Sequence, residues 1–322
     1  TSNTVIYIKD KGIVVNQPSV VAYEAKSKKI IAVGNKAKKM LGKTPEDIEV
    51  TRPIRNGVIS DYIMTERMLK IYVKSAIAKR KIWGKPNICV CVPSGVTDVQ
   101  RRAACDAVYR TGAKNVYVLE EPFAAAIGAG VDIESAVGAM VVDIGAGTTD
   151  IAIVARGGVQ QSSSIKIGGD DFDEAIIRYM RKRHNVLLGE SSAEQLKKDI
   201  GSVYPREQDA IGYARGKELV RGLPTKMAVK SSEMIEACQE ETDQIMDSIR
   251  VMLEGAPPEL VSDISEHGII LAGGGSKIFG MDKLIMDKIG VPVVNIKNPD
   301  QVVATGAGTA HYYIKDGRTL EE

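Results

Sequence analysis

Short runs of β-branched residues alternate with segments of helical periodicity along most of the chain. In one such segment Met68, Tyr72 and Ala76 recur at helical spacing and predict a single apolar helix face. Strands and amphipathic helices in alternation favour an α/β protein whose sheets are covered by helices. The pattern predicts strands over residues 4–8, 12–15, 30–33, 88–92, 116–119, 139–143, 149–155 and 269–271, and helices over residues 36–41, 65–81, 97–111, from 122 onward, 170–183, 192–200 and 231–254.

Two segments about half a chain apart follow one pattern. Thr-Ser-Asn-Thr-Val-Ile-Tyr-Ile (1–8) and Ala-Gly-Thr-Thr-Asp-Ile-Ala-Ile (146–153) each place a small polar turn before a β-branched strand. The length of 322 residues, at roughly 150 residues per domain, also suggests two domains. We therefore expect a duplicated pair of similar domains.

Composition narrows the class of protein. Hydrophobic residues make up 44% and charged residues 26%, which is typical of a globular chain and excludes a disordered or collagen-like one. The formal charge of +2 lacks the basic excess of a nucleic-acid-binding chain, so we expect no nucleic-acid partner.

The four cysteines do not have the spacing of zinc ligands and suggest a reducing compartment. No apolar run is long enough to cross a membrane. Because the chain begins with Thr1, we expect its natural N-terminus to precede it.

A glycine-rich turn connects two of the predicted strands, in the run Asp-Ile-Gly-Ala-Gly-Thr-Thr-Asp (143–150). Glycine has no Cβ, so backbone N–H groups there can approach phosphate oxygens closely. Thr148 adds a hydroxyl, and Asp143 at the strand end can hold a water bound to Mg²⁺. The alternative is a plain hairpin turn, in which glycine and aspartate are also common.

Two further glycine turns lie at strand or helix boundaries. Gly-Gly-Gly-Ser (273–276) follows a predicted strand, where a planar ring or a phosphate can lie against the backbone; tight packing of strand on helix is the alternative. Gly168 and Gly169 precede a helix, and helix capping is the alternative there. Glu194 and Lys197 lie three residues apart on one helix face, a spacing also found in solvated ion pairs.

With these turns the chain resembles the superfamily of actins, heat-shock chaperones and sugar kinases. Within it the sequence is similar over essentially its whole length to the MreB family of bacterial actins. Glu-Glu-Pro-Phe-Ala-Ala-Ala-Ile-Gly (120–128) and the turn at 143–150 carry this resemblance most clearly. Ala146 and Asp150 depart from the glycine and glutamate that are usual in the family, and neither change removes a required group. The other matching segments are 12–20, 52–61, 92–102, 257–263, 273–276 and 306–308.

The resemblance implies a nucleotide site for ATP or ADP with Mg²⁺. Asp143 would face the metal through a water, together with an aspartate expected before Thr1. Glu121 would position the attacking water as general base, and Thr148 would be its partner; capping of the following helix is the alternative for Glu121. The nucleotide contacts implied are Thr1, Ser2, Asn3, Thr4, Gly145, Ala146, Gly147, Thr148, Gly168, Gly169, Glu194, Lys197, Gly273, Gly274, Gly275 and Ser276.

The single tryptophan, Trp83, lies in a basic stretch at the end of a predicted amphipathic helix. Tryptophan favours the membrane interface, and each nearby cation contributes about 1 kcal/mol on an anionic surface. A tryptophan packed beneath the domain is the alternative, but the resemblance places a membrane-inserting dipeptide at this loop. The implied membrane contacts are Lys79, Arg80, Lys81, Ile82, Trp83 and Lys85.

The resemblance also implies a fold and a function. We expect an actin-like, ribonuclease H-like fold of four subdomains around a nucleotide cleft. The subdomains would be IA (1–22, 56–135 and 308–322), IB (23–55), IIA (136–171 and 236–307) and IIB (172–235). The expected function is an ATPase of the cytoplasm, peripheral on the inner membrane face, that polymerises to control cell shape or cell-body helicity and motility.

Expected partners are further copies of the chain, in paired antiparallel protofilaments, an anionic membrane, and RodZ-type adaptors and paralogues. Three alternatives stay open: a filament former with weak or no ATPase activity, a chaperone-type ATPase, and a small-molecule kinase. A chaperone would need a substrate-binding domain, and a kinase would need a second pocket with its own acidic base. We identify neither in this sequence.

Overall fold

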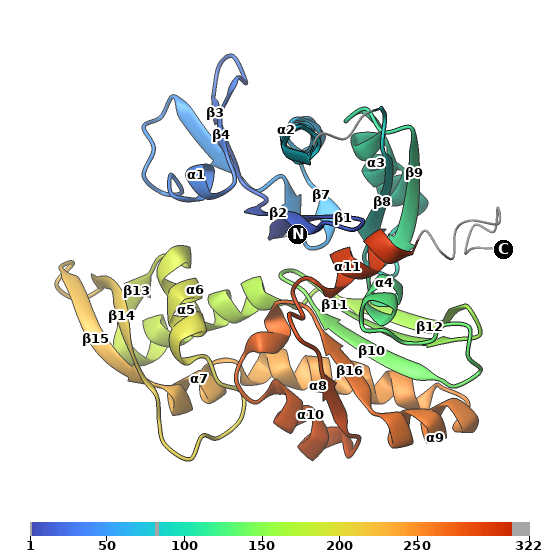
Figure 1. Cartoon of the computed structure of the whole chain (residues 1–322). Helices are drawn as coiled ribbons and strands as arrows, with labels where there is room; N and C mark the ends of the chain where they lie inside the picture. The colour runs from blue at the N-terminus through green and yellow to red at the C-terminus, as the bar shows by residue number, and fades with distance from the viewer. Residues whose placement is uncertain (1, 81–83, 311–322) are drawn as a thin grey trace. The chain divides into compact units, whose positions relative to one another are not determined.

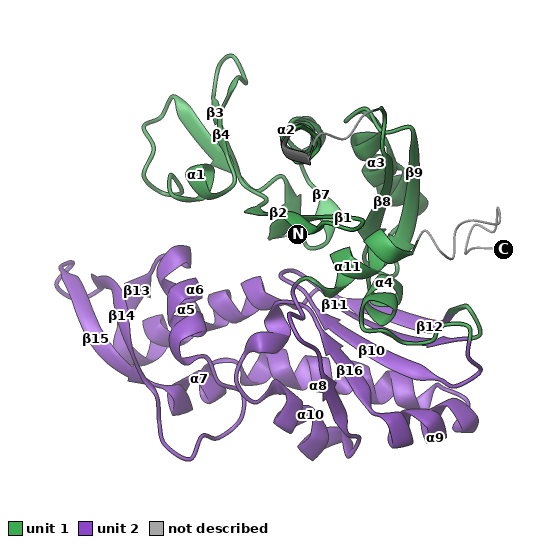
Figure 2. Cartoon of the chain, viewed as in Figure 1, with its two compact units in different colours: residues 1–134, 156–158, 301–322 green, residues 135–155, 159–300 purple. Residues whose placement is uncertain are grey.

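The computed structural model describes residues 2–80 and 84–310, and the chain divides into two compact units (Figure 2). Unit 1 comprises residues 1–134, 156–158 and 301–322, and unit 2 comprises residues 135–155 and 159–300. Figure 1 labels the elements of both units in chain order. The predicted four subdomains remain a prediction.

Unit 1 is built from short sheets and the helices that pack against them. The parallel strands β8 (Asn87–Val92) and β9 (Asn115–Glu120) are joined by helix α3 (Asp98–Tyr109), which packs on both. A helical crossover is the usual way to join adjacent parallel strands. The other elements of unit 1 are β1 (Asn3–Ile8), β2 (Gly12–Pro18), β3 (Val21–Glu24), β4 (Ile30–Val33), α1 (Asn35–Lys38), β5 (Ile48–Thr51), β6 (Ile54–Arg55), β7 (Val58–Ile59), α2 (Tyr62–Arg80), α4 (Glu121–Gly128) and α11 (Val302–Thr309).

The apolar face predicted for helix α2 forms a core of unit 1. Met68, Tyr72 and Ala76 are buried and pack against Val15 and Val21 of strands β2 and β3. The Tyr72 hydroxyl, which burial would leave without water, donates a hydrogen bond of 2.8 Å to the carbonyl of Pro18.

Helices α4 and α11 approach each other so closely that their backbones touch. A Cβ placed on Gly306 would lie 1.8 Å from the carbonyl oxygen of Ala124, and one on Gly128 would lie 2.1 Å from that of Val302. Only glycine permits this approach. The contact joins α11 to unit 1, and the predicted subdomain boundary at residue 308 remains a prediction.

Unit 2 is centred on a five-stranded sheet in the order β12-β11-β10-β16-β17. Strand β11 is buried at every position and β10 at all but its first, as expected for strands covered on both faces. Strand β10 pairs with β11 in antiparallel and with β16 in parallel orientation. These strands are β10 (Ala139–Ile144), β11 (Thr149–Ala155), β12 (Gly158–Ile165), β16 (Ile269–Ala272) and β17 (Val293–Asn295).

A second sheet in unit 2 has the antiparallel order β13-β14-β15, and helix α6 packs on β14. A Cβ on Gly212 of β14 would lie only 3.0 Å from Ile200 and Leu196 of α6, so this glycine allows close packing. The remaining elements of unit 2 are α5 (Gly169–His184), β13 (Val186–Leu188), α6 (Glu190–Ile200), β14 (Ile211–Glu218), β15 (Pro224–Lys230), α7 (Ser231–Ala237), α8 (Gln239–Glu254), α9 (Pro258–His267), the 3₁₀ helix η1 (Gly275–Lys277) and α10 (Met281–Ile289).

Two predicted helices are wrong in extent. The single helix predicted over 231–254 is two helices, α7 and α8, which are separated at Cys238. Cys238 leaves helical geometry with φ −100° and ψ 7° and is fully buried. The helix predicted over 36–41 ends at Lys38, because turns follow it.

Candidate functional site

Three glycine turns of unit 2 meet at the carboxyl ends of strands β10 and β16. The N–H of Gly169 donates to the carbonyl of Gly145 at 3.0 Å, and the N–H of Asp170 donates to that of Ala146 at 2.7 Å. A Cβ on Gly168 would lie 2.6 Å from the same Ala146 oxygen. The amino end of α5 therefore holds the 145–147 turn in place, and its first amides are occupied by that turn.

The third turn contacts the first through positions that require glycine. Gly273 has φ +85°, and a Cβ there would lie 2.1 Å from the carbonyl oxygen of Ile144 and 2.4 Å from Oδ1 of Asp143. A Cβ on Gly275 would lie 3.1 Å from the carbonyl oxygen of Gly145. Ligands of α/β sheets bind at the carboxyl ends of parallel strands, which is where these backbones converge.

The hydroxyl of Thr148 lies in the first turn without a partner. Thr148 is buried, and its Oγ1 accepts and donates no hydrogen bond among the described residues. The neighbouring Thr149 hydroxyl, in contrast, donates to the carbonyl of Ile167 at 2.8 Å. A buried hydroxyl without a partner costs about 1–3 kcal/mol, so the geometry favours a ligand or a water at Thr148.

Asp143, the predicted metal-facing residue, is the buried carboxylate at the end of β10. Among the described residues no cluster of three or more His, Cys, Asp or Glu side chains is arranged to hold a metal. Mg²⁺ usually keeps several waters and binds through one or two carboxylates plus substrate phosphates. Asp143, beside the glycine turn and the Thr148 hydroxyl without a partner, fits such an ion only together with a nucleotide.

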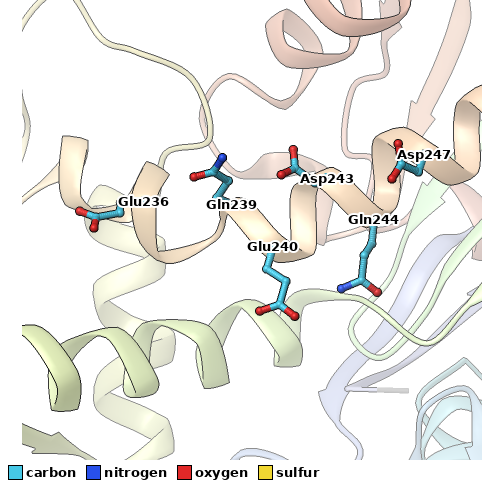
Figure 3. Close-up of a pocket in the computed structure, with 6 residues that line it drawn as sticks. All are labelled: Glu236, Gln239, Glu240, Asp243, Gln244 and Asp247. Atoms are coloured by element: carbon cyan, nitrogen blue, oxygen red, sulfur yellow. The ribbon is translucent and has the colours of Figure 1, made fainter.

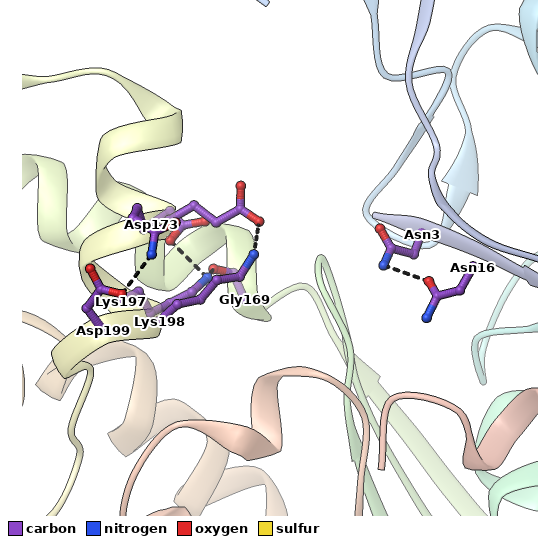
Figure 4. A network of polar contacts seen from close by, with 9 residues as sticks. Asn3, Asn16, Gly169, Asp173, Lys197, Lys198 and Asp199 are labelled. Carbon is purple, nitrogen blue, oxygen red and sulfur yellow. Dashed lines mark hydrogen bonds and ion pairs between the residues drawn. The ribbon is translucent and has the colours of Figure 1, made fainter. Parts of the chain in front are cut away.

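Lys197 of helix α6 contacts Asp173 and Gly169 of α5 (Figure 4), whereas Glu194 pairs within α6. Lys197 forms an ion pair of 2.9 Å with Asp173 of α5 and donates to the carbonyl of Gly169. Glu194 instead pairs with Lys198 at 2.6 Å. The solvated-pair alternative is therefore wrong for Lys197, which is buried against the amino end of α5.

Asp173 is a site residue that the sequence analysis missed. Burial raises the pKa of its carboxyl to about 6, against the opposing effect of Lys197. The available signal was its position between Phe172 and Ile176, because a carboxylate on the apolar face of a helix needs a partner.

The remaining candidates of unit 2 lie at the third turn. The Ser276 hydroxyl donates to the carbonyl of Gly273 at 2.7 Å and so stabilises the turn itself. Lys277, one residue later, pairs with Asp300 at 2.5 Å. A Cβ on Gly274 would meet nothing closer than the Asp300 Cβ at 3.9 Å, so this glycine is not sterically required.

The predicted contacts of unit 1 lie on hairpin β1–β2 and at helix α4. Asn3 Nδ2 donates to Asn16 Oδ1 at 3.1 Å, and the Thr4 and Ser19 hydroxyls are 2.9 Å apart. The carbonyl of Ser2 accepts from the N–H of Ser19 at 2.8 Å, and Thr1 lies outside the described residues. These bonds fix the hairpin.

Glu121 is the first residue of α4 and is followed by proline, which suits the first helical turn. The N-cap residue of α4 is Glu120, whose side chain accepts no capping hydrogen bond, and Glu121 is the acidic residue of the first turn, where its charge also suits the helix dipole. Burial raises the pKa of the Glu121 carboxyl, which makes it a stronger base than an exposed glutamate.

One hollow of about 740 Å³ lies apart from the glycine turns, along helices α7 and α8 (Figure 3). Four carboxylates line it, so it repels phosphate and does not suit a nucleotide. Its lining residues are Glu236, Gln239, Glu240, Asp243, Gln244 and Asp247.

A family model described as MreB/Mbl protein matches residues 1–319. The chain belongs to the MreB/Mbl family. It is 46% identical over 314 residues to the cell shape-determining protein MreB of Escherichia coli K12, covering 96% of this chain and 90% of that protein. It is 42% identical over 308 residues to the cell shape-determining protein Mbl of Bacillus subtilis, covering 96% and 92%.

Among solved structures the chain is similar to MreB5 of Spiroplasma citri bound to ADP. The TM-score is 0.92 at 34% identity, with 98% of this chain and 95% of that chain covered. A second structure of MreB5 is bound to AMPPNP and has a TM-score of 0.91. These matches confirm both the predicted family and the predicted actin-like fold.

Three of the six membrane contacts predicted for this MreB/Mbl chain lie outside the described residues. Lys79 and Arg80 are the last residues of α2, and Lys85 is exposed. Lys81, Ile82 and Trp83 lie outside the described residues. In the described part of the chain, no helix is both long and apolar enough to span a bilayer.

Proposed function

We propose that this chain binds and hydrolyses ATP with Mg²⁺ and polymerises into filaments that control cell shape. The observation that carries the proposal is the convergence of three glycine turns around the unpartnered Thr148 hydroxyl at the ends of β10 and β16. Family membership supports it, because relatives in the family are described as cell shape-determining proteins and MreB5 binds ADP and AMPPNP.

The turns of unit 2 account for nucleotide binding in this proposal. The 145–147 turn, which the α5 amides hold in place, takes the phosphates, and the 273–275 turn, which Gly273 and Gly275 allow to pack closely on it, takes the nucleoside. Bound Mg²⁺ would supply positive charge to the phosphate oxygens, and Asp143 would hold it through a water. Gly168, Gly169, Glu194, Lys197 and Ser276 remain predicted contacts, as do Ser2, Asn3 and Thr4.

Hydrolysis requires a base and an oriented water. As the family resemblance implies, Glu121 would accept a proton from the attacking water, with Thr148 as its predicted partner. Burial raises the pKa of Glu121 and so strengthens it as a proton acceptor. A filament that hydrolyses its nucleotide can change stability with nucleotide state, because ATP and ADP favour different conformations to different extents.

Sedimentation combined with phosphate release tests this function. Purified protein is centrifuged with Mg-ATP, Mg-ADP, or ATP plus EDTA, and released phosphate is measured in parallel. Pelleting with phosphate release in Mg-ATP is the expected result. Pelleting without phosphate release would show the filament former of weak ATPase activity instead. Protein that stays in the supernatant at high concentration in every nucleotide contradicts the proposal.

We further propose that the filament lies on the inner face of the membrane through the loop that contains Ile82 and Trp83. Loss of the indole in Trp83→Ala is expected to reduce co-sedimentation with anionic liposomes at least tenfold, because an interfacial tryptophan beside several cations contributes strongly to binding. Liposomes of neutral lipid should bind the unaltered chain weakly, since the lysine and arginine side chains then have no anionic headgroups to attract them.

The matched control for that experiment is Val220→Ala. Val220 is 78% exposed at the tip of the β14–β15 turn, so its substitution also removes an exposed apolar side chain. It should leave liposome binding unchanged. Equal binding by Trp83→Ala and the unaltered chain would refute the anchor.

A further inference from the structure

Asp173 and Lys197 form a buried ion pair that connects two helices of unit 2. The carboxylate of Asp173 on α5 lies 2.9 Å from the ammonium of Lys197 on α6, and their side chains are only 13% and 16% exposed. A buried charge is tolerated only with a partner, and removing one partner of such a pair leaves the other uncompensated. The ion pair with Lys197 therefore exists only while the Asp173 carboxyl is ionised.

Lys197 also reaches the backbone that supports the phosphate turn. Its ammonium donates to the carbonyl of Gly169 (Figure 4). The N–H of Gly169 in turn donates to the carbonyl of Gly145 at 3.0 Å. A Cβ on Gly169 would lie 3.4 Å from the Lys197 ammonium and 3.6 Å from the Gly145 oxygen. A continuous chain of polar contacts thus runs from Asp173 through Lys197 and Gly169 to the 145–147 turn.

The packing of α5, α6 and α8 determines which charged and titratable side chains lie near Asp173. Lys197 lowers its pKa, while Glu194 on α6 and Asp170 on α5 raise it. Cys238, between α7 and α8, faces the pair, but burial raises the pKa of its thiol to about 12, so it stays neutral. Beyond it, Glu241 and Arg178 pair with each other at 2.5 Å.

We propose that ionised Asp173 is a positioning residue for nucleotide binding, which holds Lys197 on the Gly169 carbonyl and thereby fixes the 145–147 turn. The proposal rests on the proposed nucleotide site and deepens it. Asp173 touches no nucleotide in this account and acts only through Lys197. Protonation of the carboxyl removes the counter-charge from Lys197, which then leaves the Gly169 carbonyl for solvent.

The direction in which ATP affinity changes with pH follows from the pKa of Asp173. Burial raises the pKa of Asp173 to about 6, so its protonated fraction grows as the pH falls from 7 to 5. ATP affinity falls over the same interval. The free energy of unfolding, in contrast, rises as the pH falls, because a carboxyl with a raised native pKa binds its proton more tightly in the folded chain. A purely structural role would therefore not produce the loss of affinity.

The experiment compares the unaltered chain with Asp173→Asn by titration with Mg-ADP between pH 5 and pH 8. The unaltered chain should lose affinity about tenfold from pH 7.5 to pH 5, the size expected for one hydrogen bond to a charged group. Asp173→Asn should bind about tenfold more weakly at pH 7.5 and show no such decline, since asparagine does not titrate. Because ionisation of the nucleotide is common to both titrations, the difference between the two curves isolates residue 173.

Two controls keep the result specific. His184→Gln removes a different polar contact of unit 2, the 2.6 Å pairing of His184 with Glu233, and should keep the unaltered pH profile. Lys197→Met should match Asp173→Asn in losing the pH dependence, and circular dichroism confirms that each variant is folded. Parallel profiles for Asp173→Asn and the unaltered chain would overturn the inference alone. Absence of ADP binding by the unaltered, folded chain at every pH would overturn the proposed function instead.

Discussion

Gly273→Ala is expected to abolish measurable ATP binding and to lower the free energy of unfolding by about 3 kcal/mol. Two costs add at this position. The backbone has φ +85°, which disfavours any residue with a Cβ, and the new methyl group would lie 2.1 Å from the carbonyl oxygen of Ile144. The Ile144 oxygen cannot move without displacing the end of strand β10. The 273–276 turn must therefore move away from the 145–147 turn.

The loss of binding follows from the second contact of the same methyl group. It would lie 2.4 Å from Oδ1 of Asp143, the carboxylate proposed to face the metal. Calorimetric titration with Mg-ATP measures the affinity, and urea unfolding measures the stability. Retained affinity in Gly273→Ala would show that the nucleoside does not lie at this turn.

Gly290→Ala is the matched control. Gly290 ends helix α10 with φ +80°, yet a Cβ there would meet nothing within 4 Å. This variant isolates the backbone cost, about 1 kcal/mol, and should bind ATP like the unaltered chain. A second comparison, Gly274→Ala, concerns stability alone. Gly274 has ordinary helical angles, so alanine there should leave the free energy of unfolding within about 1 kcal/mol.

Glu121→Gln is expected to lower phosphate release by a factor of about 10²–10⁴, the usual contribution of a general base, with ATP affinity nearly unchanged. Glutamine keeps the size of the side chain and cannot accept the proton. Because the pKa of Glu121 is raised, activity of the unaltered chain should decline as the pH falls through that pKa and the carboxylate becomes protonated. The residual activity of Glu121→Gln should lack this acid limb.

The neighbouring carboxylate supplies the control for that rate effect. Glu120 accepts a hydrogen bond of 2.5 Å from the Ser94 hydroxyl and ends strand β9, so Glu120→Gln alters charge at the adjacent residue without removing the proposed base. It should release phosphate at close to the unaltered rate. If Glu121→Gln turned over ATP as fast as Glu120→Gln, the assignment of the base would be wrong.

The strands and helices with strong periodicity could be predicted from the sequence, and those with inverted periodicity could not. Strand β14 buries Gly212 and Ala214 and exposes Ile211 and Tyr213, so its hydrophobic pattern gives no sign of its buried face. The small residues are required there because helix α6 packs so closely. The hydrophobic pattern of one strand does not show how closely a helix from elsewhere in the chain packs against it.

The break at Cys238 was equally invisible in the sequence. No glycine or proline marks it, and the polar run at 239–244 is as compatible with one long helix as with two. Its carbonyl still accepts from the N–H of Thr242 at 3.0 Å, so α8 begins immediately after it. Tertiary packing overrides helix propensity at such a position.

The glycine turns could be found because glycine marks a backbone constraint locally. Their convergence followed only from the family resemblance, and the structure now gives the contacts within unit 2. Asp173 could not be found as a partner of Lys197, because the two lie on different helices, 24 positions apart in the chain. Pairing across helices depends on packing that no short-range pattern specifies.

Calorimetric titration of the unaltered chain with Mg-ATP tests the central claim most directly. The account predicts one saturable site per chain, with binding that EDTA weakens and ADP displaces. A folded sample that takes up no ATP at millimolar concentration would contradict the assignment of the three glycine turns as a nucleotide site.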